Sequence, residues 1–498
     1  MTAWSPIVHL PDDPTPLYAR IASRIADDIR AGRLTPGQRL PGSRTLAATL
    51  GVHRNTVLAA YADLTAQGWI ASAPGSATRV CATFPERPLA PRATVTPAPS
   101  TDGLAFDLPS PDLLTLLPPP PPPHVLNMAG GLPDPRLIPH LDLARAYRRH
   151  LARRGGPALG YGDPQGDTAL RAELAAMLAA RRGLQVTPAH ILVTRGSQMA
   201  LYLTAQLLAR GRDVAVEALG YPPAWAALRT AGARLLPIDL DEDGLDVDAL
   251  ARLGPALSTL SAVYLTPHHQ YPTLATLAAA RRVRLIALAR HHRFALIEDD
   301  YDNELHYEGR PVPPLACADT LDVVIYVGSL SKVLAPGLRL GYVVAHTDVI
   351  ERLTQLRTVV DRQGDLPMEA AVAELLEDGT IQRHVNRLRR TCHARRDALL
   401  DALHTHLPDA LTAPCPRGGM AVWARVADGI DVDRWARSAL DLGVATGPGR
   451  RYTFADHPIP HLRLGFAALN PEQLDAAVRR LGEALPPPSQ GRSGSVEG

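Results

Sequence analysis

Lysine occurs only once in this 498-residue sequence, at position 332, and every other member of the 52 lysines and arginines is an arginine. Arginine serves well at surfaces and in ion pairs. It cannot form an imine, because the guanidinium stays protonated and is a poor nucleophile. The lysine that is retained is therefore a candidate for amine chemistry, and retention by chance is the alternative.

The residues around this lysine predict a phosphate site. In the segment YVGSLSKVLAPGLRLGY, Lys332 follows an apolar run and lies in a Ser-x-Ser-Lys turn. Ser329 and Ser331 can donate hydrogen bonds to phosphate oxygens, and Arg339 can pair with them through its planar fork of donors. A surface ion pair is the alternative for Arg339.

An amine beside a phosphate site suits pyridoxal phosphate. This cofactor needs a lysine for the aldimine, a carboxylate against the pyridine nitrogen, phosphate donors and a ring packed on its face. The segment ALIEDDYDNEL follows a predicted strand. We expect Asp299 to face the pyridine nitrogen and Tyr301 to form a hydrogen bond with the phenolic oxygen. An acidic run of this kind is more often a solvated loop, which is the alternative.

Two further segments supply the remaining contacts. In ILVTRGSQMALYL, a strand, a glycine turn and a helix start follow one another. The amides of Gly196, Ser197 and Gln198 are expected to bind phosphate at this helix N-terminus. In EALGYPPAW, Tyr221 is placed to stack on the ring, with plain packing as the alternative.

The elements that must position these residues alternate between helices and short apolar strands from residue 125 to 485. Predicted strands lie at 191–193, 214–216, 262–265, 295–297 and 323–327. This alternation predicts an α/β domain with a mostly parallel sheet. A proline-rich linker is predicted at 82–124, with six consecutive prolines, and a disordered tail at 486–498.

Residues 14–81 predict a separate α+β domain, a winged helix-turn-helix. Leu17, Ile21, Ile25 and Ile29 repeat every four residues, which is typical of one apolar helix face. Ser43 is expected to cap a second helix. A third helix starts near residue 53, and two strands around 74–76 form the wing. Tyr61 and Trp69 are expected to pack inside this domain.

The start of the third helix is expected to read DNA bases in the major groove. It carries His53, Arg54, Asn55 and Thr56. Arginine suits guanine and asparagine suits adenine by bidentate geometry. Two further arginines are expected to contact DNA, Arg44 at the preceding helix and Arg79 in the wing. Each arginine taken alone is more often a solvated surface charge.

These segments carry a family resemblance. The stretch from PLYARIASRIADD to LTAQGWI resembles the winged helix-turn-helix of GntR-type regulators. The lysine, aspartate and glycine-turn segments, with YGDPQGDTALRAELAAMLAARRG and LRLGFA, resemble fold-type I aminotransferases. Together they resemble the MocR family of transcription regulators. The resemblance implies that Arg463 holds the carboxylate of an amino-acid effector, and that the protein is a homodimer with each head over the partner's large domain.

The sequence departs from the family pattern at the segment TPHHQYPTLATL. The family has glycine where Leu274 stands, and this change could narrow or reshape the ligand pocket. Either Gln270 or His269 is placed to contact the phenolic oxygen, and the sequence does not decide between them.

The predicted function is a pyridoxal phosphate-dependent transcription regulator. The cofactor, held as an internal aldimine at Lys332 alone or with an amino-compound effector, would modulate binding to an operator with paired half-sites. One alternative is a working aminotransferase that carries a DNA-binding domain, with Lys332 as general base; we expect slow or partial transamination at most. Another is a dimerisation module with an inactive pocket, against which the retained lysine argues.

Composition excludes other classes of protein. The net charge of +2 is not that of a polycation, and no apolar stretch approaches the roughly 18 residues of a membrane span. The four cysteines are scattered, without paired or metal-binding spacing, so no metal site is predicted. The start of the chain does not resemble a signal peptide, and a reduced cytoplasm is the expected location.

Overall fold

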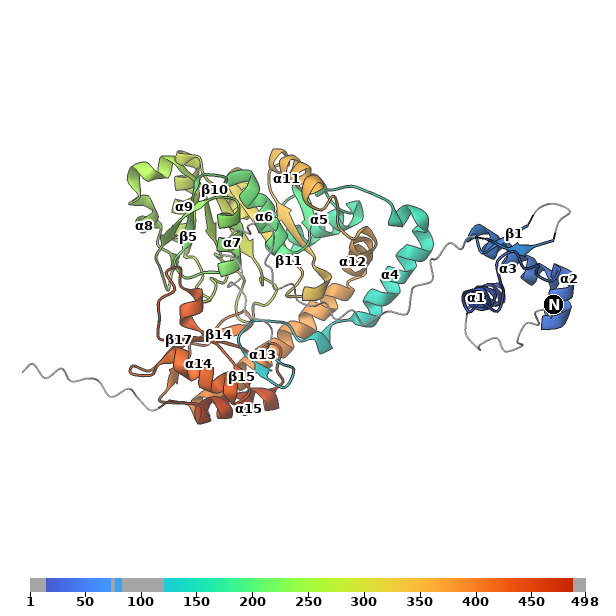
Figure 1. Ribbon diagram of the computed structural model, residues 1–498. Helices are drawn as coiled ribbons and strands as arrows, with labels where there is room; N and C mark the ends of the chain where they lie inside the picture. The colour runs from blue at the N-terminus through green and yellow to red at the C-terminus, as the bar shows by residue number, and fades with distance from the viewer. Residues whose placement is uncertain (1–14, 73–76, 83–120, 487–498) are drawn as a thin grey trace, which may run out of the picture. The chain divides into compact units, whose positions relative to one another are not determined.

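The computed structural model describes residues 15–72, 77–82 and 121–486. The chain divides into two compact units, residues 1–110 and 111–498, and each is described by itself (Figure 1). The predicted wing tip, most of the predicted linker and nearly all of the predicted tail lie outside the described residues. Within the described part of the chain, no helix is both long and apolar enough to cross a membrane.

The first unit contains three helices and a two-stranded hairpin. The elements are α1 (Leu17–Arg30), α2 (Ser43–Leu50), α3 (Arg54–Ala66), β1 (Ile70–Ala71) and β2 (Arg79–Val80). The two strands pair antiparallel. The apolar faces of the three helices and the hairpin form one buried core, which includes Ile21, Ile25, Ile29, Leu46, Val57, Leu64 and Trp69. The helix order and the buried positions of Tyr61 and Trp69 agree with the expected winged helix-turn-helix.

Leu17 is 38% exposed, because it lies in the first turn of α1 and the buried part of the stripe begins one turn later. One local prediction for this unit was wrong. Ser43 is the first residue of α2 and not its cap. The N-cap is Gly42, without a side-chain cap bond, and the Ser43 hydroxyl accepts a hydrogen bond from Arg54 Nε at 3.3 Å.

The second unit is built on a seven-stranded sheet in the order β4-β12-β11-β10-β9-β5-β6. The strands are β4 (Ile191–Thr194), β5 (Asp213–Glu217), β6 (Arg234–Ile238), β9 (Leu260–Leu265), β10 (Ala295–Asp300), β11 (Val324–Ser329) and β12 (Gly341–Val344). All neighbours pair parallel except β12, which is antiparallel to both β11 and β4. The mostly parallel sheet is therefore confirmed, and β6 and β12 are additions to the five strands predicted.

Helices cover both faces of this sheet, because alternate strand residues enter different cores. Val263 and Leu296 belong to one core, and Tyr264 and Ile297 belong to the other. The helices of the unit are α4 (His140–Arg154), α5 (Thr168–Arg182), α6 (Ser197–Leu208), α7 (Pro222–Thr230), α8 (Val247–Ala251), α9 (Ala279–His292), α10 (Leu315–Asp319), α11 (Thr347–Val360) and α12 (Leu366–Glu377).

A smaller antiparallel sheet follows in the chain, in the order β13-β14-β17-β16. Its strands are β13 (Leu411–Thr412), β14 (Ala421–Val426), β16 (Gly447–Pro448) and β17 (His461–Gly465). It packs with the helices α13 (Thr380–His406), α14 (Val432–Asp441) and α15 (Pro471–Glu483) around a third core (Figure 1). Two short pairs complete the unit: β3 (Leu126–Asn127) with β15 (Val444–Ala445), and β7 (Leu240–Asp241) with β8 (Gly244–Leu245).

Candidate functional site

The acidic run at the end of β10 is buried, so the alternative of a solvated loop is wrong. Glu298, Asp299 and Asp300 are exposed by 1%, 5% and 3%. Glu298 accepts hydrogen bonds from two backbone amides at the start of α10, and Asp300 accepts one from Tyr326 Oη at 2.6 Å. Because strand residues alternate, Asp299 faces the opposite side of the sheet from these two.

Asp299 has one committed oxygen and one free oxygen. Its Oδ2 accepts a hydrogen bond from Tyr264 Oη on the neighbouring strand β9, at 2.9 Å. Its Oδ1 is buried and has no hydrogen-bond partner among the described residues. Burial raises the pKa of Asp299 to about 7, although the Tyr264 hydroxyl acts in the opposite direction. A cation placed at Oδ1 would favour the ionised carboxylate.

Lys332 lies in the turn that follows β11. Its Nζ donates a hydrogen bond to the carbonyl oxygen of Gly131, at 2.9 Å. Burial and then the charge of Arg463 lower the pKa of Lys332 to about 8, while the carboxylates of Asp302 and Asp299 raise it. These four charged side chains therefore act on one another electrostatically, and the amine is more easily deprotonated than an ordinary lysine.

Arg463 is a buried arginine on β17 with free donors. It is 3% exposed, and its Nε and Nη1 have no hydrogen-bond partner in the part of the chain that the structure describes. Its guanidinium lies 4.6 Å from the ring centroid of Tyr271. Gly131 makes room for it, because a Cβ added there would lie 3.0 Å from Arg463 Nη2. Arg463 is therefore a buried guanidinium and not a solvated surface charge.

Tyr271 is the centre of an aromatic cluster. Its ring centroid lies 5.3 Å from that of Tyr221, 5.6 Å from Tyr452 and 6.0 Å from Tyr301. The Tyr301 hydroxyl is buried, and none of the described residues bonds it. Tyr221 is the N-cap of α7. Sequence reasoning missed Tyr271 and Tyr452; the signal available for Tyr271 was its place directly after Gln270.

The two residues proposed to contact the phenolic oxygen are both engaged elsewhere. The Gln270 amide donates to the carbonyls of Leu219 and Tyr271, at 2.7 Å each, and its Oε1 accepts from Thr273. His269 Nδ1 lies 2.8 Å from Asp302 Oδ1. A cofactor contact from Gln270 stays a prediction, and it would require one of these bonds to break.

The predicted phosphate donors surround the start of α6. Gly196 is the N-cap with φ of +78°, a conformation that favours glycine. The Arg339 guanidinium packs over it, since a Cβ at Gly196 would lie 2.9 Å from Arg339 Nη2. Ser331 N donates to Ser329 Oγ at 3.1 Å, so these two serines form one compact turn before Lys332.

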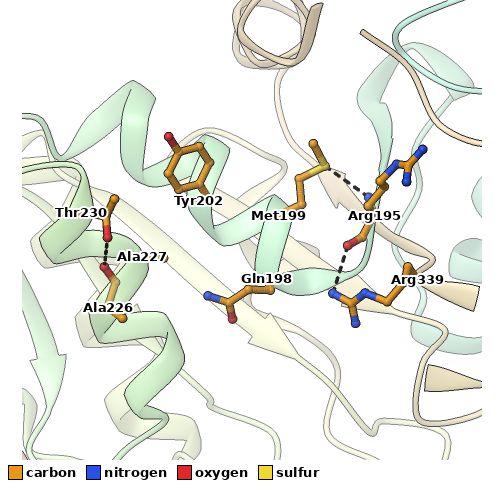
Figure 2. A pocket seen from close by; sticks show the side chains of 8 residues that line it. All are labelled: Arg195, Gln198, Met199, Tyr202, Ala226, Ala227, Thr230 and Arg339. Atoms are coloured by element: carbon orange, nitrogen blue, oxygen red, sulfur yellow. Dashed lines mark hydrogen bonds between the residues drawn. The ribbon is translucent and has the colours of Figure 1, made fainter. Parts of the chain in front are cut away.

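A cavity of about 430 Å³ opens beside the same helix start (Figure 2). Figure 2 shows the residues that line it: Gln198, Met199 and Tyr202 from α6, Ala226, Ala227 and Thr230 from α7, and Arg195 and Arg339 from the segments before α6 and after Lys332. Arg339 Nη2 donates to the Arg195 carbonyl at 3.2 Å, and Gln198 Nε2 donates to Pro223 O at 2.8 Å. Gln198 Oε1 has no partner among the residues described.

In the first unit, the start of α3 is exposed. His53, Arg54 and Asn55 are exposed and Thr56 is half-buried. His53 is also the N-cap of α3, because its Nδ1 accepts a hydrogen bond from Asn55 N at 3.3 Å. The bond from Arg54 Nε to Ser43 ties the starts of α2 and α3 together.

The other two arginines predicted to contact DNA are both exposed, but they differ in their contacts within the unit. Arg44, in the first turn of α2, is exposed. Arg79 is exposed, but its Nη1 donates to the Gly37 carbonyl at 2.9 Å, so it also ties the hairpin to the segment before α2.

The comparisons with known proteins agree with this two-part organisation. Residues 17–80 match the family of bacterial regulatory proteins, gntR family, and residues 124–481 match aminotransferase class I and II. The probable rhizopine catabolism regulatory protein MocR of Rhizobium meliloti is 30% identical over 95% of this chain and 94% of its own. This chain belongs to the MocR family of transcription regulators.

A second full-length relative is the HTH-type transcriptional regulator TauR of Rhodobacter capsulatus, 33% identical over 94% of this chain and 96% of its own. The large unit of the MocR-family chain has a fold-type I aminotransferase fold. It is similar to the solved structure of LysN, the alpha-aminoadipate aminotransferase of Thermus thermophilus, with a TM-score of 0.67 and 34% identity. That match covers 73% of this chain and 92% of LysN, whose structure contains N-(5'-phosphopyridoxyl)-L-leucine.

Proposed function

We propose that this MocR-family regulator binds pyridoxal phosphate at Lys332, and that the cofactor, alone or with an amino-compound effector, modulates binding to its operator. The observation that carries the proposal is the set of buried polar atoms around Lys332 that lack partners among the described residues. Three residues contribute them: Asp299 through Oδ1, Tyr301 through its hydroxyl, and Arg463 through Nε and Nη1. A buried polar group without a partner costs about 1–3 kcal/mol, so such a set favours a bound ligand.

The types of these atoms fit the cofactor. When bound, pyridoxal phosphate supplies an aldehyde that bonds covalently to an amine and a ring that withdraws electrons. Lys332 would provide the amine, which its lowered pKa keeps partly neutral near pH 8. Asp299 Oδ1 would accept a hydrogen bond from the protonated pyridine nitrogen, and the Tyr301 hydroxyl would hydrogen-bond the phenolic oxygen. Tyr221 would pack on the ring.

The phosphate would be held at the start of α6. The helix N-terminus presents free backbone amides and the positive end of the helix dipole to an anion. We assign Gly196, Ser197 and Gln198 to this role through their amides, with the hydroxyls of Ser329 and Ser331 and the guanidinium of Arg339. Arg339 lies against Gly196, which supports its part in the same site.

An amino-acid effector would complete the site through its carboxylate. The Arg463 guanidinium is buried, and its Nε and Nη1 have no hydrogen-bond partner among the described residues. A guanidinium is the group that a carboxylate matches best in charge-assisted hydrogen bonds. An effector controls DNA binding only if it has different affinities for two states of the regulator. Competition between the effector's amine and Lys332 would supply that difference.

The DNA-binding head would read paired half-sites as part of a homodimer. The exposed residues Arg54 and Asn55 lie at the start of α3, where a helix-turn-helix contacts base edges. His53, Thr56, Arg44 and Arg79 belong to the same proposed surface. The TauR and MocR relatives carry regulator names, which supports a regulatory output. The cytoplasmic location stays a prediction.

Aminotransferase activity is a second candidate, favoured by the lowered pKa of Lys332. A lysine of pKa about 8 can hold or release a proton near neutral pH, as a general base requires. The 2-aminoadipate transaminase of Thermus thermophilus is 35% identical over 72% of this chain and 90% of its own. An assay of turnover with an amino donor and a keto acceptor distinguishes an enzyme from a sensor. We expect slow or partial transamination at most.

The proposed function is tested by DNA binding with and without cofactor. The full chain is mixed with DNA from its own upstream region at a stated salt concentration, because affinity depends steeply on salt. We expect pyridoxal phosphate to change the affinity of the wild type and leave Lys332→Ala unchanged. Borohydride reduction should attach the cofactor at residue 332 alone. Labelling at another site, or an equal response of Lys332→Ala, would overturn the proposal.

A further inference from the structure

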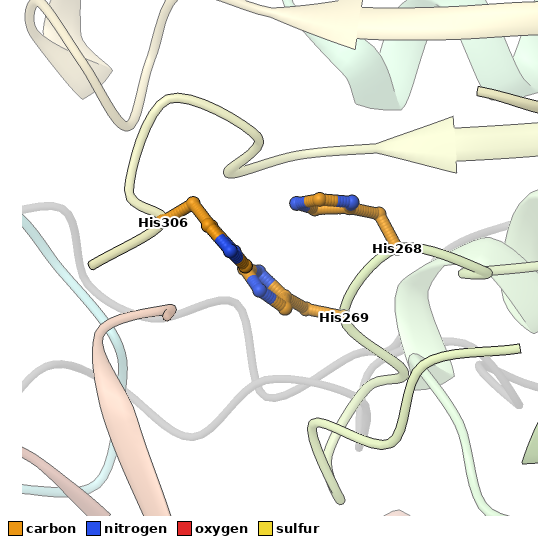
Figure 3. Close-up of side chains that lie close together, drawn as sticks. All are labelled: His268, His269 and His306. Carbon is orange, nitrogen blue, oxygen red and sulfur yellow. The ribbon is translucent and has the colours of Figure 1, made fainter. Parts of the chain in front are cut away.

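Three histidines of the large unit meet beside the loop that follows β9. His268 and His269 belong to this loop, and His306 lies on the segment after β10 (Figure 3). The ring centroids of His268 and His269 are 4.2 Å apart, and His306 lies 5.9 Å from the first and 6.1 Å from the second. One ring nitrogen of each lies within 4.8 Å of the others.

His268 is the member that most requires a ligand. Its side chain is 5% exposed, and neither of its ring nitrogens has a hydrogen-bond partner in the described part of the chain. A buried imidazole normally satisfies at least its donor nitrogen, because leaving it unpaired costs about 1–3 kcal/mol. Nδ1 of His306 is also buried without a partner among the described residues. Both rings therefore have nitrogens that the protein itself does not use.

His269 is already oriented for ligation. Its Nδ1 lies 2.8 Å from Asp302 Oδ1, so the carboxylate holds the proton at Nδ1 and leaves a lone pair at Nε2. Metal-binding histidines commonly have such a carboxylate partner behind them. Gly418 packs closely against this edge of the ring, because a Cβ there would lie 2.6 Å from Nε2.

We propose that His268, His269 and His306 bind one divalent transition-metal ion, with Zn²⁺ as the best match. Imidazole nitrogen is a preferred ligand of Zn²⁺, Co²⁺, Ni²⁺ and Cu²⁺. Zn–N bonds of about 2.0–2.1 Å in a tetrahedral site place the nitrogens about 3.4 Å apart. The rings must therefore close by roughly an ångström, which side-chain rotation supplies. Three imidazoles leave the fourth position for water.

The site does not depend on the proposed function, because neither the cofactor nor DNA enters the argument or its test.

Calorimetric titration of the full chain, free of any affinity tag and stripped with a chelator, tests the inference with Zn²⁺ alone. We expect one equivalent of metal per chain. The double variant His268→Asn, His306→Gln should lose affinity by at least about 10-fold. The matched control is the double variant His291→Asn, His292→Gln. These two histidines are adjacent in the sequence at the end of α9, with ring centroids 4.7 Å apart, and the control should bind Zn²⁺ as the wild type does.

A second measurement covers the case in which the double variant does not fold. Co²⁺ bound by imidazoles in a tetrahedral site gives intense visible absorption, whereas hydrated Co²⁺ absorbs weakly. We expect the intense spectrum with the wild type and its loss on adding Zn²⁺. Absence of this spectrum, unchanged Zn²⁺ affinity in the His268, His306 variant, or an equal loss in the α9 control would each overturn the site.

Discussion

Tyr264 donates a hydrogen bond from its hydroxyl to Oδ2 of Asp299, across 2.9 Å between two neighbouring parallel strands. Tyr264 is opposite Ile297 in the register of β9 and β10, so Asp299 lies two residues further along on the same face. The bond fixes the carboxylate so that Oδ1 remains free. Tyr264 is therefore a positioning residue for the proposed pyridine contact.

Removing this hydroxyl should weaken the cofactor site. In Tyr264→Phe, Asp299 loses the one bond that lowers its pKa, so the ionised carboxylate becomes less favourable. A hydrogen bond to a charged group contributes about 1.5–3 kcal/mol, and we expect at least about tenfold weaker binding of pyridoxal phosphate. Titration followed by cofactor absorbance measures the dissociation constant.

Tyr326→Phe is the matched control for that change. Tyr326 donates to Asp300 Oδ2 at 2.6 Å, one residue away on the other face of the same strand. Its loss should lower stability and leave cofactor affinity unchanged. Equal weakening in both variants would mean that Tyr264 acts only through the stability of the sheet.

The stability of the cofactor-free protein should depend on Asp299 and pH. The folded pKa of Asp299 is raised from 3.8 to about 7 by burial. The folded state therefore binds more protons than the unfolded state between about pH 4 and 7, and stability falls as pH rises through that window. In Asp299→Asn, which can still accept the Tyr264 bond, this penalty is absent. Its stability advantage should grow to at most about 4 kcal/mol above pH 7.

Thermal unfolding of wild type and Asp299→Asn at pH 5 and pH 8 measures this difference. The variant should gain relative to the wild type at pH 8 and should bind the cofactor more weakly at both values. A stability difference that is the same at both pH values would contradict the raised pKa.

Much of this site followed from local sequence. Lys332 and Asp299 each lie at or just after the end of an apolar strand. An apolar run followed by polar residues of this kind can be recognised in the amino-acid sequence alone. The Tyr264–Asp299 hydrogen bond was not predictable in the same way, because it depends on the register of two neighbouring strands. Its two partners are 35 residues apart in the sequence. The position of the Arg463 guanidinium likewise depends on Gly131, in a distant loop, which leaves room for Nη2.

The fold showed the same division. Five buried strands of the large sheet appear as apolar runs, and these were found. The parallel strand β6, which is partly exposed, was missed. The antiparallel strand β12 was missed because its residues Gly341–Val344 were taken together with the lysine segment. The cap of α2 was placed one residue too late, since a serine one position inside the helix gives nearly the same sequence signal as a serine cap. Whether Ser43 caps α2 or bonds Arg54 is decided by tertiary contact.

Leu274 should be strained where the family resemblance places glycine. Its φ is +66°, in the left-handed region that costs a residue with a Cβ about 1 kcal/mol or more. The pair Leu274→Gly and Leu274→Ala removes the same side chain beyond Cβ. We therefore expect the glycine variant to be more stable by about 1 kcal/mol. Chemical denaturation of the two variants measures the difference.

The opposite order is expected at a helical control position. Val283, in the second turn of α9, is 70% exposed, and there Val283→Ala should be more stable than Val283→Gly by about 1 kcal/mol. If alanine were the more stable at both positions, the left-handed conformation of Leu274 would be wrong.

Arg54 should determine base preference at one operator position. In Arg54→Ala, loss of a bidentate pair with guanine should cost about 1–3 kcal/mol at that base and relax the preference there. Arg54→Lys keeps the charge and loses the planar fork, so it should retain the salt dependence but not the preference. Binding to a set of single-base operator variants measures both. If Arg54→Lys retained the full preference, Arg54 would act through charge alone.

Arg463 should control both effector binding and the ionisation of Lys332. Its charge is the second cause, after burial, that lowers the pKa of Lys332. In Arg463→Gln that pKa should rise, so less neutral amine is present at pH 7 and the pH profile of cofactor attachment shifts to higher pH. Amino-acid effectors should also bind more weakly, because the carboxylate loses a bidentate partner.

The control is Arg425→Gln. Arg425 is an exposed arginine on the neighbouring strand β14 that pairs with Asp428, and its replacement should change neither the pH profile nor effector binding. A variant that loses effector binding with an unshifted attachment profile would separate the two roles and place Arg463 too far from Lys332 to influence its amine.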